Sequence, residues 1–384
     1  MDLNGKRILF AAGGTGGHVN PALAAAGYIR EHWPEAEILF VGTPDKIEAR
    51  LVPAAGFAFK TIKIDGFLRK LSLRSIRRNL SVLSALPASY IKAGQILKDF
   101  RPDVVVGMGG YVTGPVLRKA VRMGIPVAIH EQNAYPGVAN KAVAPKAGAI
   151  MLTVEKAAEH MKFKTPPVLT GLPVRMDLLT ADREKSREEL GLGDRPLILS
   201  MGGSLGARAI NAAVAEMIVL KHESNCVFMH ATGSKGLWVK DVLREKGINL
   251  SNESNVIIRE YIDDMARCMS AADVVISRAG AGTLSEIQAL GKVSILIPSP
   301  NVAENHQFHN AMALVSKGAA LMIEEKDLTG KILSEKVFAL LEDKALSKSI
   351  GENAARLSIP DSAARIAECI GRLASGQKNN FLRS

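Results

Sequence analysis

The chain has 384 residues, of which 47% are hydrophobic and 23% charged, a balance that is typical of folded globular proteins and excludes a disordered chain. Its 34 Gly and 17 Pro lack the period of a fibrous protein. No uncharged run reaches the roughly 18 apolar residues that a membrane-spanning helix needs. The net charge of +11 indicates an anionic partner, which could be a nucleic acid, an anionic membrane surface or an anionic substrate.

Short β-branched apolar runs alternate with amphipathic stretches, a pattern that predicts βα units and parallel sheets. In the first half we expect strands at 7–12, 37–42, 59–64, 103–107, 126–130, 149–153 and 167–170. In the second half we expect them at 196–201, 226–231, 256–260, 273–277, 293–297 and 320–323. The amino terminus carries Asp2 and only a brief apolar run, so it does not predict a signal peptide.

The basic excess gathers in one segment, 66–98, which holds seven Lys or Arg and no acid. Leu73, Ile76, Leu80 and Leu83 form an apolar stripe at helical spacing, with Arg74, Arg77 and Arg78 beside it. The other cations of the segment are Arg69, Lys70, Lys92 and Lys98. An apolar tip ringed by cations suits the surface of an anionic lipid leaflet. The alternative is a helix packed on its own domain with a solvated basic face. The segment has few aromatic residues for base stacking, so we expect no nucleic-acid partner.

The stretch 171–195 has few apolar residues and a charged run, and it predicts a connection with a short helix at 181–190. We place the domain boundary there, with domains at 1–172 and 173–359. An amphipathic helix is expected at 360–373. Cys226, Cys268 and Cys369 are odd in number and far apart, which predicts buried thiols in a reducing cytoplasm.

Each half opens with a strand that runs into a glycine-rich turn, at 13–17 and at 202–206. In the first turn Asn20 is the expected helix N-cap and Pro21 the first helical residue. Glycines let a backbone approach a ligand closely, and a helix N-terminus attracts phosphate. The alternative is that these glycines only form a tight βα corner.

A third glycine-rich turn, at 277–283, also leads from a strand into a helix, and its amides suit a pyrophosphate. Glu286 follows in that helix and can accept two hydrogen bonds from a ribose diol, or it is only a solvated acid near the helix N-terminus.

Motifs of other nucleotide-binding proteins are missing from the sequence. The spacing G-x-G-x-x-G fails at Val19, and no Gly-Lys-Ser/Thr follows a glycine loop, which excludes a typical dinucleotide dehydrogenase and a P-loop NTPase. There is no Asp-x-Asp, and His306 with His309 lacks a third metal ligand nearby. We therefore expect phosphate chemistry with no metal and no cofactor, in which amides and helix ends neutralise the anion.

Several motifs occur in one order along nearly the whole chain: GGTGGH at 13–18, GMGGY at 107–111, HEQN at 130–133, GGS…GAR at 202–208, YIDDM at 261–265, RAGAGTLSE at 278–286 and NHQ at 305–307. In this order the chain resembles the MurG family, the bacterial N-acetylglucosaminyltransferases of peptidoglycan synthesis. The resemblance implies an α/β GT-B fold, in which two Rossmann-like domains with parallel sheets face a central cleft. It also implies that the terminal segment 360–384 joins the first domain.

The resemblance further implies an inverting transfer of GlcNAc from UDP-GlcNAc to the C4 hydroxyl of MurNAc in lipid I (undecaprenyl-pyrophosphoryl-MurNAc-pentapeptide), which gives lipid II. The enzyme would be peripheral, at the cytoplasmic face of the bacterial cell membrane. The first domain would serve the acceptor and the membrane, and the second would bind UDP-GlcNAc.

Site residues follow from the same resemblance, with the donor mainly on the second domain. Ile262 would meet the uracil through its backbone, with Tyr261 over the ring, and Glu286 would hold the ribose. Ser204 would hold the pyrophosphate together with the amides of Ala281, Gly282, Thr283, Leu284 and Ser285. Arg175 would lie near the nucleotide and Gln307 would contact the sugar. From the first domain would come Thr15, Gly16, Gly17 and Asn133.

The transfer needs a base beside the acceptor hydroxyl, and His18 at the end of the first glycine loop is our candidate. The alternative is that His18 only orients the loop or a phosphate. Glu131 is a weaker candidate base, which could instead fix the loop that carries Asn133. Two positions depart from the family pattern: Leu205 stands where Gln is usual, and Leu172 where Asn is usual.

Three rival interpretations stay open at this point. The closest is another GT-B protein, such as a glycolipid synthase or a UDP-GlcNAc 2-epimerase. The others are a basic nucleic-acid-binding protein and an unusual dinucleotide oxidoreductase. The sequence has no RNP-type or zinc motif that would support nucleic-acid binding, and it lacks the glycine spacing of a dinucleotide oxidoreductase.

Overall fold

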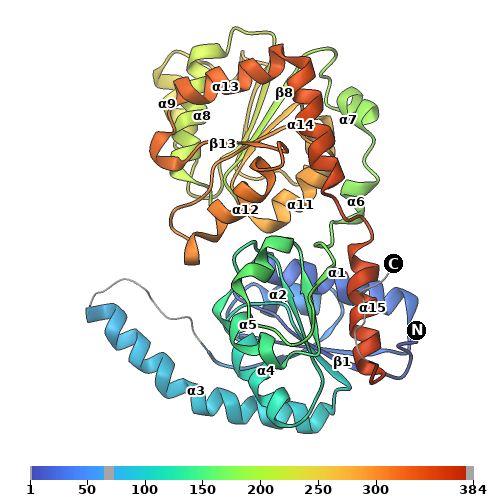
Figure 1. Ribbon diagram of the computed structural model, residues 1–384. Helices are drawn as coiled ribbons and strands as arrows, with labels where there is room; N and C mark the ends of the chain where they lie inside the picture. The colour runs from blue at the N-terminus through green and yellow to red at the C-terminus, as the bar shows by residue number, and fades with distance from the viewer. Residues whose placement is uncertain (1, 65–72, 378–384) are drawn as a thin grey trace. The chain divides into compact units, whose positions relative to one another are not determined.

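The structure is a computed structural model that describes residues 2–64 and 73–377, with the backbone alone for 73–85. The chain divides into two compact units: unit 1 is Met1–Pro173 with Ile359–Ser384, and unit 2 is Val174–Ser358. Each unit is a parallel sheet covered by helices (Figure 1). The predicted fold class, two Rossmann-like α/β domains, is confirmed, and all thirteen predicted strands are present.

The described residues of unit 1 form a sheet of seven parallel strands in the order β3-β2-β1-β4-β5-β6-β7. The strands are β1 (Arg7–Ala11), β2 (Glu37–Gly42), β3 (Ala58–Thr61), β4 (Val104–Gly107), β5 (Val127–Glu131), β6 (Ala149–Leu152) and β7 (Val168–Leu169). The central strands β1, β4 and β5 are buried along nearly their whole length, because helices cover both faces of the sheet. The order reverses between β1 and β4, and ligands of such sheets bind at the carboxyl edge there.

The helices of unit 1 are α1 (Gly16–His32), α2 (Glu48–Ala54), α3 (Leu73–Phe100), α4 (Thr113–Arg122), α5 (Val138–Val143) and α15 (Ser362–Ala374), with short 3₁₀ turns at Ala144–Lys146 and Glu155–His160. The apolar stripe at 73–83 therefore lies on a helical backbone, as its spacing predicts. Residues 66–72 and the side chains of 73–85, which include Arg69, Lys70, Arg74, Arg77 and Arg78, lie outside the described residues.

The terminal helix α15 packs beside α1 and against strands β4, β5 and β6 (Figure 1). Its apolar side, with Ile366 and Ile370, is fully buried in the unit 1 core. The carboxy-terminal segment therefore completes the first unit, although unit 2 separates it from that unit along the chain.

The described residues of unit 2 form a sheet of six parallel strands in the order β10-β9-β8-β11-β12-β13. The strands are β8 (Leu197–Met201), β9 (Val227–Ala231), β10 (Val256–Arg259), β11 (Val274–Ser277), β12 (Ser294–Leu296) and β13 (Leu321–Met322). The order again reverses beside the first strand, between β8 and β11, so both units carry the same kind of carboxyl edge.

The helices of unit 2 are α6 (Met176–Leu179), α7 (Arg183–Glu189), α8 (Arg208–Lys221), α9 (Val239–Glu245), α10 (Met265–Ala271), α11 (Ala281–Ala289), α12 (His306–Val315), α13 (Gly330–Glu342) and α14 (Lys344–Arg356), with 3₁₀ turns at Ala303–Asn305 and Glu325–Asp327. The predicted helix at 181–190 is α7, which Asp182 caps by accepting from the amide of Lys185. The preceding turn α6 was not predicted.

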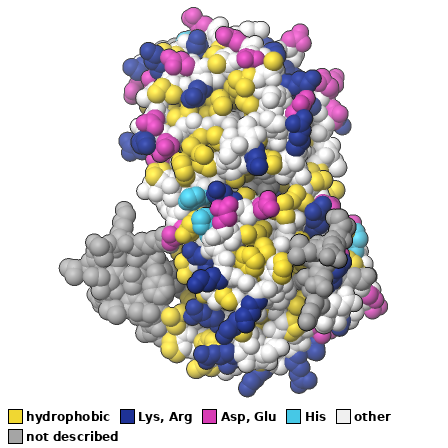
Figure 2. Space-filling view, viewed as in Figure 1, with side chains coloured by type: hydrophobic (Ala, Val, Ile, Leu, Met, Phe, Trp, Pro, Cys, Tyr) yellow, Lys and Arg dark blue, Asp and Glu magenta, His cyan; other side chains and the backbone are white. Residues whose placement is uncertain are grey.

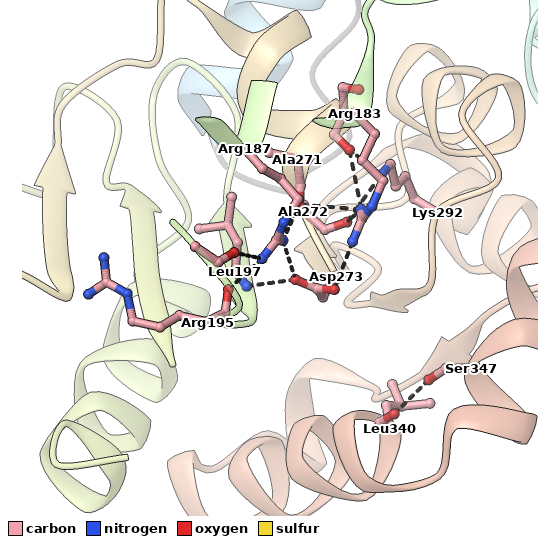
Figure 3. A network of polar contacts seen from close by, with 12 residues as sticks. Arg183, Arg187, Arg195, Leu197, Ala271, Ala272, Asp273, Lys292, Leu340 and Ser347 are labelled. Carbon is pink, nitrogen blue, oxygen red and sulfur yellow. Dashed lines mark hydrogen bonds and ion pairs between the residues drawn. The ribbon is translucent and has the colours of Figure 1, made fainter. Parts of the chain in front are cut away.

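An arginine pair fastens α7 to the sheet of unit 2 (Figure 3). Arg183 and Arg187 each pair with Asp273, over 2.9 and 3.1 Å, and Asp273 also accepts from the amide of Leu197 at the start of β8. The segment that connects the two units is therefore held by half-buried polar contacts at the amino edge of the unit 2 sheet, opposite the glycine-rich edge.

The prediction that Asn20 is the N-cap of the first helix is wrong. The helix α1 begins at Gly16 with Thr15 as N-cap, and Pro21 lies inside it at the sixth position. The amides of both His18 and Val19 donate to Thr15 O, so the helical hydrogen bonds begin five residues before the expected cap. Gly16 and Gly17 consequently belong to the first helical turn and not to the loop.

The three cysteines are free and buried, as predicted. In the part of the chain that the structure describes, no helix combines the length and apolarity that crossing a bilayer requires.

Candidate active site

Glycine-rich loops from β1 and β4 touch at the carboxyl edge of the unit 1 sheet. A Cβ on Gly110 would lie 2.1 Å from the carbonyl oxygen of Gly13, so only glycine permits this approach. A Cβ on Gly109 would lie 2.5 Å from the ring of His18, and Gly109 also has a φ of +95°. The two loops therefore fix one another and position the imidazole of His18 between them.

His18 is half-buried in the first turn of α1, and its Nδ1 lies 3.2 Å from Oγ1 of Thr15. When Nδ1 donates to the threonine, the proton-accepting nitrogen is Nε2, on the side of the ring that faces Gly109. The structure thus brings together the predicted residues Thr15, Gly16, Gly17 and His18 around one helix N-terminus. The first-turn amides of that helix point toward the edge and favour an anion.

The buried carboxylate of Glu48, which the sequence analysis did not predict, holds the first glycine-rich loop by a hydrogen bond. Glu48 is fully buried, and its Oε2 accepts from the amide of Gly14 over 3.0 Å. Its Oε1 accepts from the amide and the hydroxyl of Thr43. The sequence does not distinguish Glu48 from the chain's many other acids, so nothing in it singles this residue out.

Glu131, the weaker candidate base, is almost fully buried and saturated with hydrogen bonds. Its Oε1 accepts from the amide and the side chain of Asn133, and its Oε2 accepts from the amide of Gly137 and from Asn140. Because these four donors use both oxygens, the geometry favours the alternative role, in which Glu131 fixes the loop that carries Asn133.

His130 and Gln132 connect the same loop to the rest of the edge. Burial lowers the pKa of His130 to about 4, so the ring is neutral, and its Nε2 donates to Gly171 O over 2.9 Å. Gln132 donates to Nδ1 of His130 and to Met108 O, and its buried Oε1 has no partner. These residues stand in the HEQN motif, but only the structure shows that they link β4, β5 and the end of unit 1.

In unit 2 the helix α11 begins at the carboxyl end of β11 and has no side-chain cap. Among the five predicted residues, Ala281, Gly282 and Thr283 hold the first-turn positions whose amides have no intrahelical partner. The amide of Leu284 donates to Gly280 O, and the side chains of Leu284 and Ser285 are buried. Three of the five predicted amides can therefore meet a diphosphate.

Glu286 and Arg175 lie close enough for their charges to interact, although 111 residues separate them along the chain. Burial raises the pKa of the Glu286 carboxyl, Arg175 opposes that shift, and Asp177 adds to it. The carboxylate stands in the second turn of α11, above the free first-turn amides. This pairing places a hydrogen-bond acceptor and a cation beside one anion-binding helix end.

The remaining predicted donor residues are spread over neighbouring loops of unit 2. Ser204 is exposed, Ile262 is buried, and Tyr261 is exposed beside it. Gln307 accepts from the amide of Ser299 through Oε1 and so is tied to the loop after β12.

Next to Gln307 the backbone adopts positive φ at two consecutive non-glycine residues, Glu304 (52°) and Asn305 (49°). Such left-handed conformations are unfavourable for residues with a Cβ and cluster at functional sites. The start of α12 is therefore held in a defined position next to the predicted sugar contact.

Within residues 2–64 and 73–377, no group of three or more His, Cys, Asp and Glu side chains is arranged to hold a metal ion. The two departures from the family pattern differ in their surroundings. Leu172 is buried, whereas Leu205 is exposed on the loop after β8.

Both halves of the chain match models of known domains. Residues 8–152 match the glycosyltransferase family 28 N-terminal domain, and residues 197–366 match the glycosyltransferase family 28 C-terminal domain.

Relatives and solved structures agree with these matches. The chain is 44% identical over 95% of its length to the UDP-N-acetylglucosamine–N-acetylmuramyl-(pentapeptide) pyrophosphoryl-undecaprenol N-acetylglucosamine transferase of Acetivibrio thermocellus, covering 97% of that protein. It is 41% identical over 97% of its length to the transferase of the same name from Desulforamulus reducens, covering all of it. The crystal structure of Acinetobacter baumannii MurG superposes with a TM-score of 0.75 at 28% identity, covering 96% of this chain and 99% of that one.

Two Rossmann-like units with glycine-rich carboxyl edges and these matches define a glycosyltransferase of the GT-B fold. The chain belongs to glycosyltransferase family 28 and, within it, to the MurG family of N-acetylglucosamine transferases.

Proposed function

We propose that the chain transfers N-acetylglucosamine from UDP-N-acetylglucosamine to undecaprenyl-pyrophosphoryl-N-acetylmuramyl-pentapeptide, a step of peptidoglycan synthesis. The observation that carries the proposal is the identity of 41–44% to transferases named for these substrates, over 95% or more of the chain. The acceptor atom is the C4 hydroxyl of N-acetylmuramic acid, and the anomeric carbon inverts in a single displacement.

The donor binds to the carboxyl edge of unit 2. The free amides of Ala281, Gly282 and Thr283, with Ser204, hold the diphosphate, and the α11 N-terminus stabilises the charge that develops on departing UDP. Glu286 accepts from the ribose hydroxyls, Arg175 stands beside the nucleotide, and Gln307 contacts the sugar. Ile262, with Tyr261, holds the uracil. These groups neutralise the leaving group without a bound divalent cation.

From unit 1, Thr15, Gly16, Gly17 and Asn133 contact the donor, and His18 acts as the general base. Its Nε2 takes the proton of the acceptor hydroxyl as that oxygen bonds to the anomeric carbon and the bond from this carbon to the phosphate oxygen breaks. The support is the Thr15 contact at Nδ1, which orients the ring; in the tautomer in which Nδ1 donates to Thr15, Nε2 is the basic nitrogen. A positioned base of this kind contributes typically about 10²- to 10⁴-fold to the rate.

Unit 1 also binds the anionic cytoplasmic surface of the cell membrane, where its lipid-linked acceptor resides. The support is a cavity of about 930 Å³ among α3, α4 and α5, lined by apolar groups such as Leu86, Pro87 and Val121. Arg118, Arg122 and Lys146 stand around it and are exposed. Figure 2 shows Lys and Arg side chains interspersed with hydrophobic ones on the viewed face of unit 1.

One assay tests the reaction. Radiolabelled UDP-N-acetylglucosamine is incubated with the lipid-linked acceptor or a soluble analogue, with and without EDTA. Label transfer that depends on the acceptor and survives EDTA is the expected result. Release of N-acetylmannosamine without any transfer would instead indicate an epimerase, and loss of transfer in EDTA would contradict metal independence.

A further inference from the structure

A second cavity lies in unit 2 at the amino end of α8, beside the loop that follows β8. Its volume is about 550 Å³, and it is lined by Leu205, Gly206, Arg208, Asn211, Lys235 and Trp238. None of these six residues belongs to the donor site proposed above. The volume falls within the range of about 300–1,000 Å³ that is usual for pockets that bind small ligands.

The cavity has a rigid wall, because two backbone loops are joined around it. The amides of Ser234 and Lys235 donate to the carbonyl oxygens of Ser204 and Leu205. A Cβ on Gly236 would lie 2.1 Å from Nδ2 of Asn211, so this glycine lets the second loop close over the asparagine. The wall of the pocket is therefore formed by hydrogen-bonded backbone at the edge of the sheet and not by side chains alone.

The charge of the cavity is positive and is not balanced locally. Arg208 and Lys235 are both exposed, and among the described residues neither forms an ion pair with an acidic side chain. Arg208 is also the first residue of α8, a helix of fourteen residues without a side-chain cap, whose positive end adds to the two cations. The cavity therefore attracts an anion.

A buried acceptor supplies the second, independent observation. Asn211 is 1% exposed, and its Nδ2 donates to Thr232 O over 2.9 Å, which fixes the orientation of the amide. Asn211 lines the cavity, and its buried Oδ1 has no hydrogen-bond partner among the described residues. A buried acceptor without a partner is costly, and a ligand that brings an N–H or O–H donor removes that cost.

Together these features describe a ligand with a carboxylate for Arg208 and Lys235, a neighbouring N–H for Asn211, and small apolar groups for Leu205 and Trp238. The end of a peptide combines all three. We propose that this cavity binds the carboxylate-bearing peptide of the acceptor, which makes unit 2 a contributor to acceptor recognition as well as to donor binding. The inference rests on the proposed function, because the acceptor is known only from the names of relatives.

The first experiment does not depend on catalysis. A pentapeptide with a free carboxylate, and the same peptide amidated at its carboxyl end, are titrated into the full-length protein by calorimetry. We expect the free acid to bind roughly tenfold more tightly than the amide, since a charge-assisted hydrogen bond is lost. Arg208→Gln with Lys235→Gln should abolish that difference, whereas Lys317→Gln, an exposed lysine elsewhere on unit 2, should preserve it. Equal binding of the two peptides, or no binding at millimolar concentration, would overturn the proposal.

The second experiment separates the acceptor's own peptide from any other peptide. Transfer is measured with the lipid-linked acceptor in free-acid and amidated forms. In the wild type we expect the KM for the amidated acceptor to be about tenfold higher than the KM for the free-acid acceptor. In Arg208→Gln/Lys235→Gln the two acceptors should have the same KM. Binding of the free peptide without this KM effect would overturn the assignment to the acceptor. If the protein transferred no sugar at all, the proposed function would fail while the calorimetric result still tested the cavity.

Discussion

The side-chain amide of Asn140 donates to Oε2 of Glu131 over 2.9 Å, and the amide of Gly137 donates to the same oxygen. With the two donors from Asn133 on Oε1, the carboxylate holds together the loop that carries Asn133. A base must have a lone pair free for the substrate proton, and this carboxylate has both oxygens occupied by the protein.

Replacing Glu131 with glutamine should therefore destabilise unit 1 rather than change the chemical step alone. One oxygen becomes an NH₂ group that faces N–H donors, and we expect the free energy of unfolding to fall by about 2–4 kcal/mol. Urea unfolding measures this, with Asn133→Ala as a control that removes only one of the four donors, the side-chain amide, and leaves the other three. A Glu131→Gln protein of wild-type stability with a much reduced kcat would contradict the positioning role.

For His18 we expect a change in turnover and not in donor affinity. His18→Ala should lower kcat by about 10²- to 10⁴-fold while the Kd for UDP stays within about twofold, because the base acts on the acceptor proton only. Thr15→Val, which removes the partner of Nδ1 and keeps the ring, should give a smaller loss. Normal turnover at saturating donor with weakened UDP binding would assign His18 to binding instead.

The sequence predicted the layers of both units because long apolar runs and glycine turns are local signals. All thirteen strands and the terminal amphipathic helix α15 follow from such patterns. The start of α1 did not, since Asn20-Pro21 is the stronger capping signal by composition while Thr15 takes the cap in the folded chain. Two hydrogen bonds to Thr15 O decide that boundary, and no local propensity encodes them.

The residues of the site divide in the same way. The loop glycines and Glu286 of α11 can be recognised in the sequence as parts of motifs. The buried polar residues that hold these loops in place cannot. Glu48 reaches Gly14 across 34 positions, and His130 reaches Gly171 across 41. Such contacts depend on the order of strands in the sheet, and one sequence without tertiary information does not specify which buried polar groups will meet.

Glu286 should control both the strength and the pH dependence of UDP binding. Losing the hydrogen bonds to the ribose hydroxyls in Glu286→Ala should weaken UDP binding by about 2–3 kcal/mol, roughly a hundredfold in Kd. The pKa of this carboxyl is raised by burial, and only the ionised form accepts from both hydroxyls, so wild-type affinity should fall as the pH drops toward that raised pKa.

Calorimetric titration of UDP into the wild type at several pH values measures the pH dependence. A second comparison tests the ribose contact itself: wild type against Glu286→Ala, each with UDP and with 2′-deoxy-UDP. The missing hydroxyl should weaken binding to the wild type and scarcely affect the variant. Equal penalties in both proteins would show that Glu286 does not meet the ribose.

Membrane binding should depend on the cations around the large cavity of unit 1. Reversing Arg118, Arg122 and Lys146 to Glu should lower adsorption to anionic vesicles by roughly a hundredfold or more, since each cation contributes about 1 kcal/mol. Vesicle sedimentation at several salt concentrations measures this.

The matched control reverses three exposed lysines of unit 2, Lys246, Lys317 and Lys331, and should adsorb like the wild type. The same prediction applies to Arg74, Arg77 and Arg78, whose side chains lie outside the described residues. Equal adsorption of both triple variants would make the patch an ordinary basic surface.

A buried lysine on the amino edge of the unit 2 sheet should make the free energy of unfolding of this unit depend on pH above neutrality. Lys292 is 7% exposed, and its Nζ donates to the carbonyl oxygens of Ser270 and Ala272, beside Arg183 and Asp273 (Figure 3). Burial, with Arg183 and Arg187 nearby and Asp273 opposing, lowers the pKa of Lys292 from 10.5 to about 7. A neutral amine still has two N–H groups for the two carbonyls.

The sign of the pH effect follows from proton binding. Between about pH 7 and 10.5 the unfolded chain carries a proton on Lys292 that the folded chain lacks, so stability rises with pH through this window. The slope from this one residue is at most about 1.4 kcal/mol per pH unit. Below pH 7 both states are protonated and the contribution is at its lowest.

Lys292→Met removes the titrating group. As the pH rises from 7 to 9, the free energy of unfolding of the wild type should therefore increase relative to that of the variant. Urea unfolding followed by the fluorescence of Trp238, which lies in unit 2, measures that difference. Lys317→Met should show no such trend, because that lysine is exposed. If wild type and Lys292→Met gave parallel profiles from pH 7 to 9, Lys292 would keep its proton in the folded chain, and the two carbonyls with Asp273 would outweigh the effect of burial.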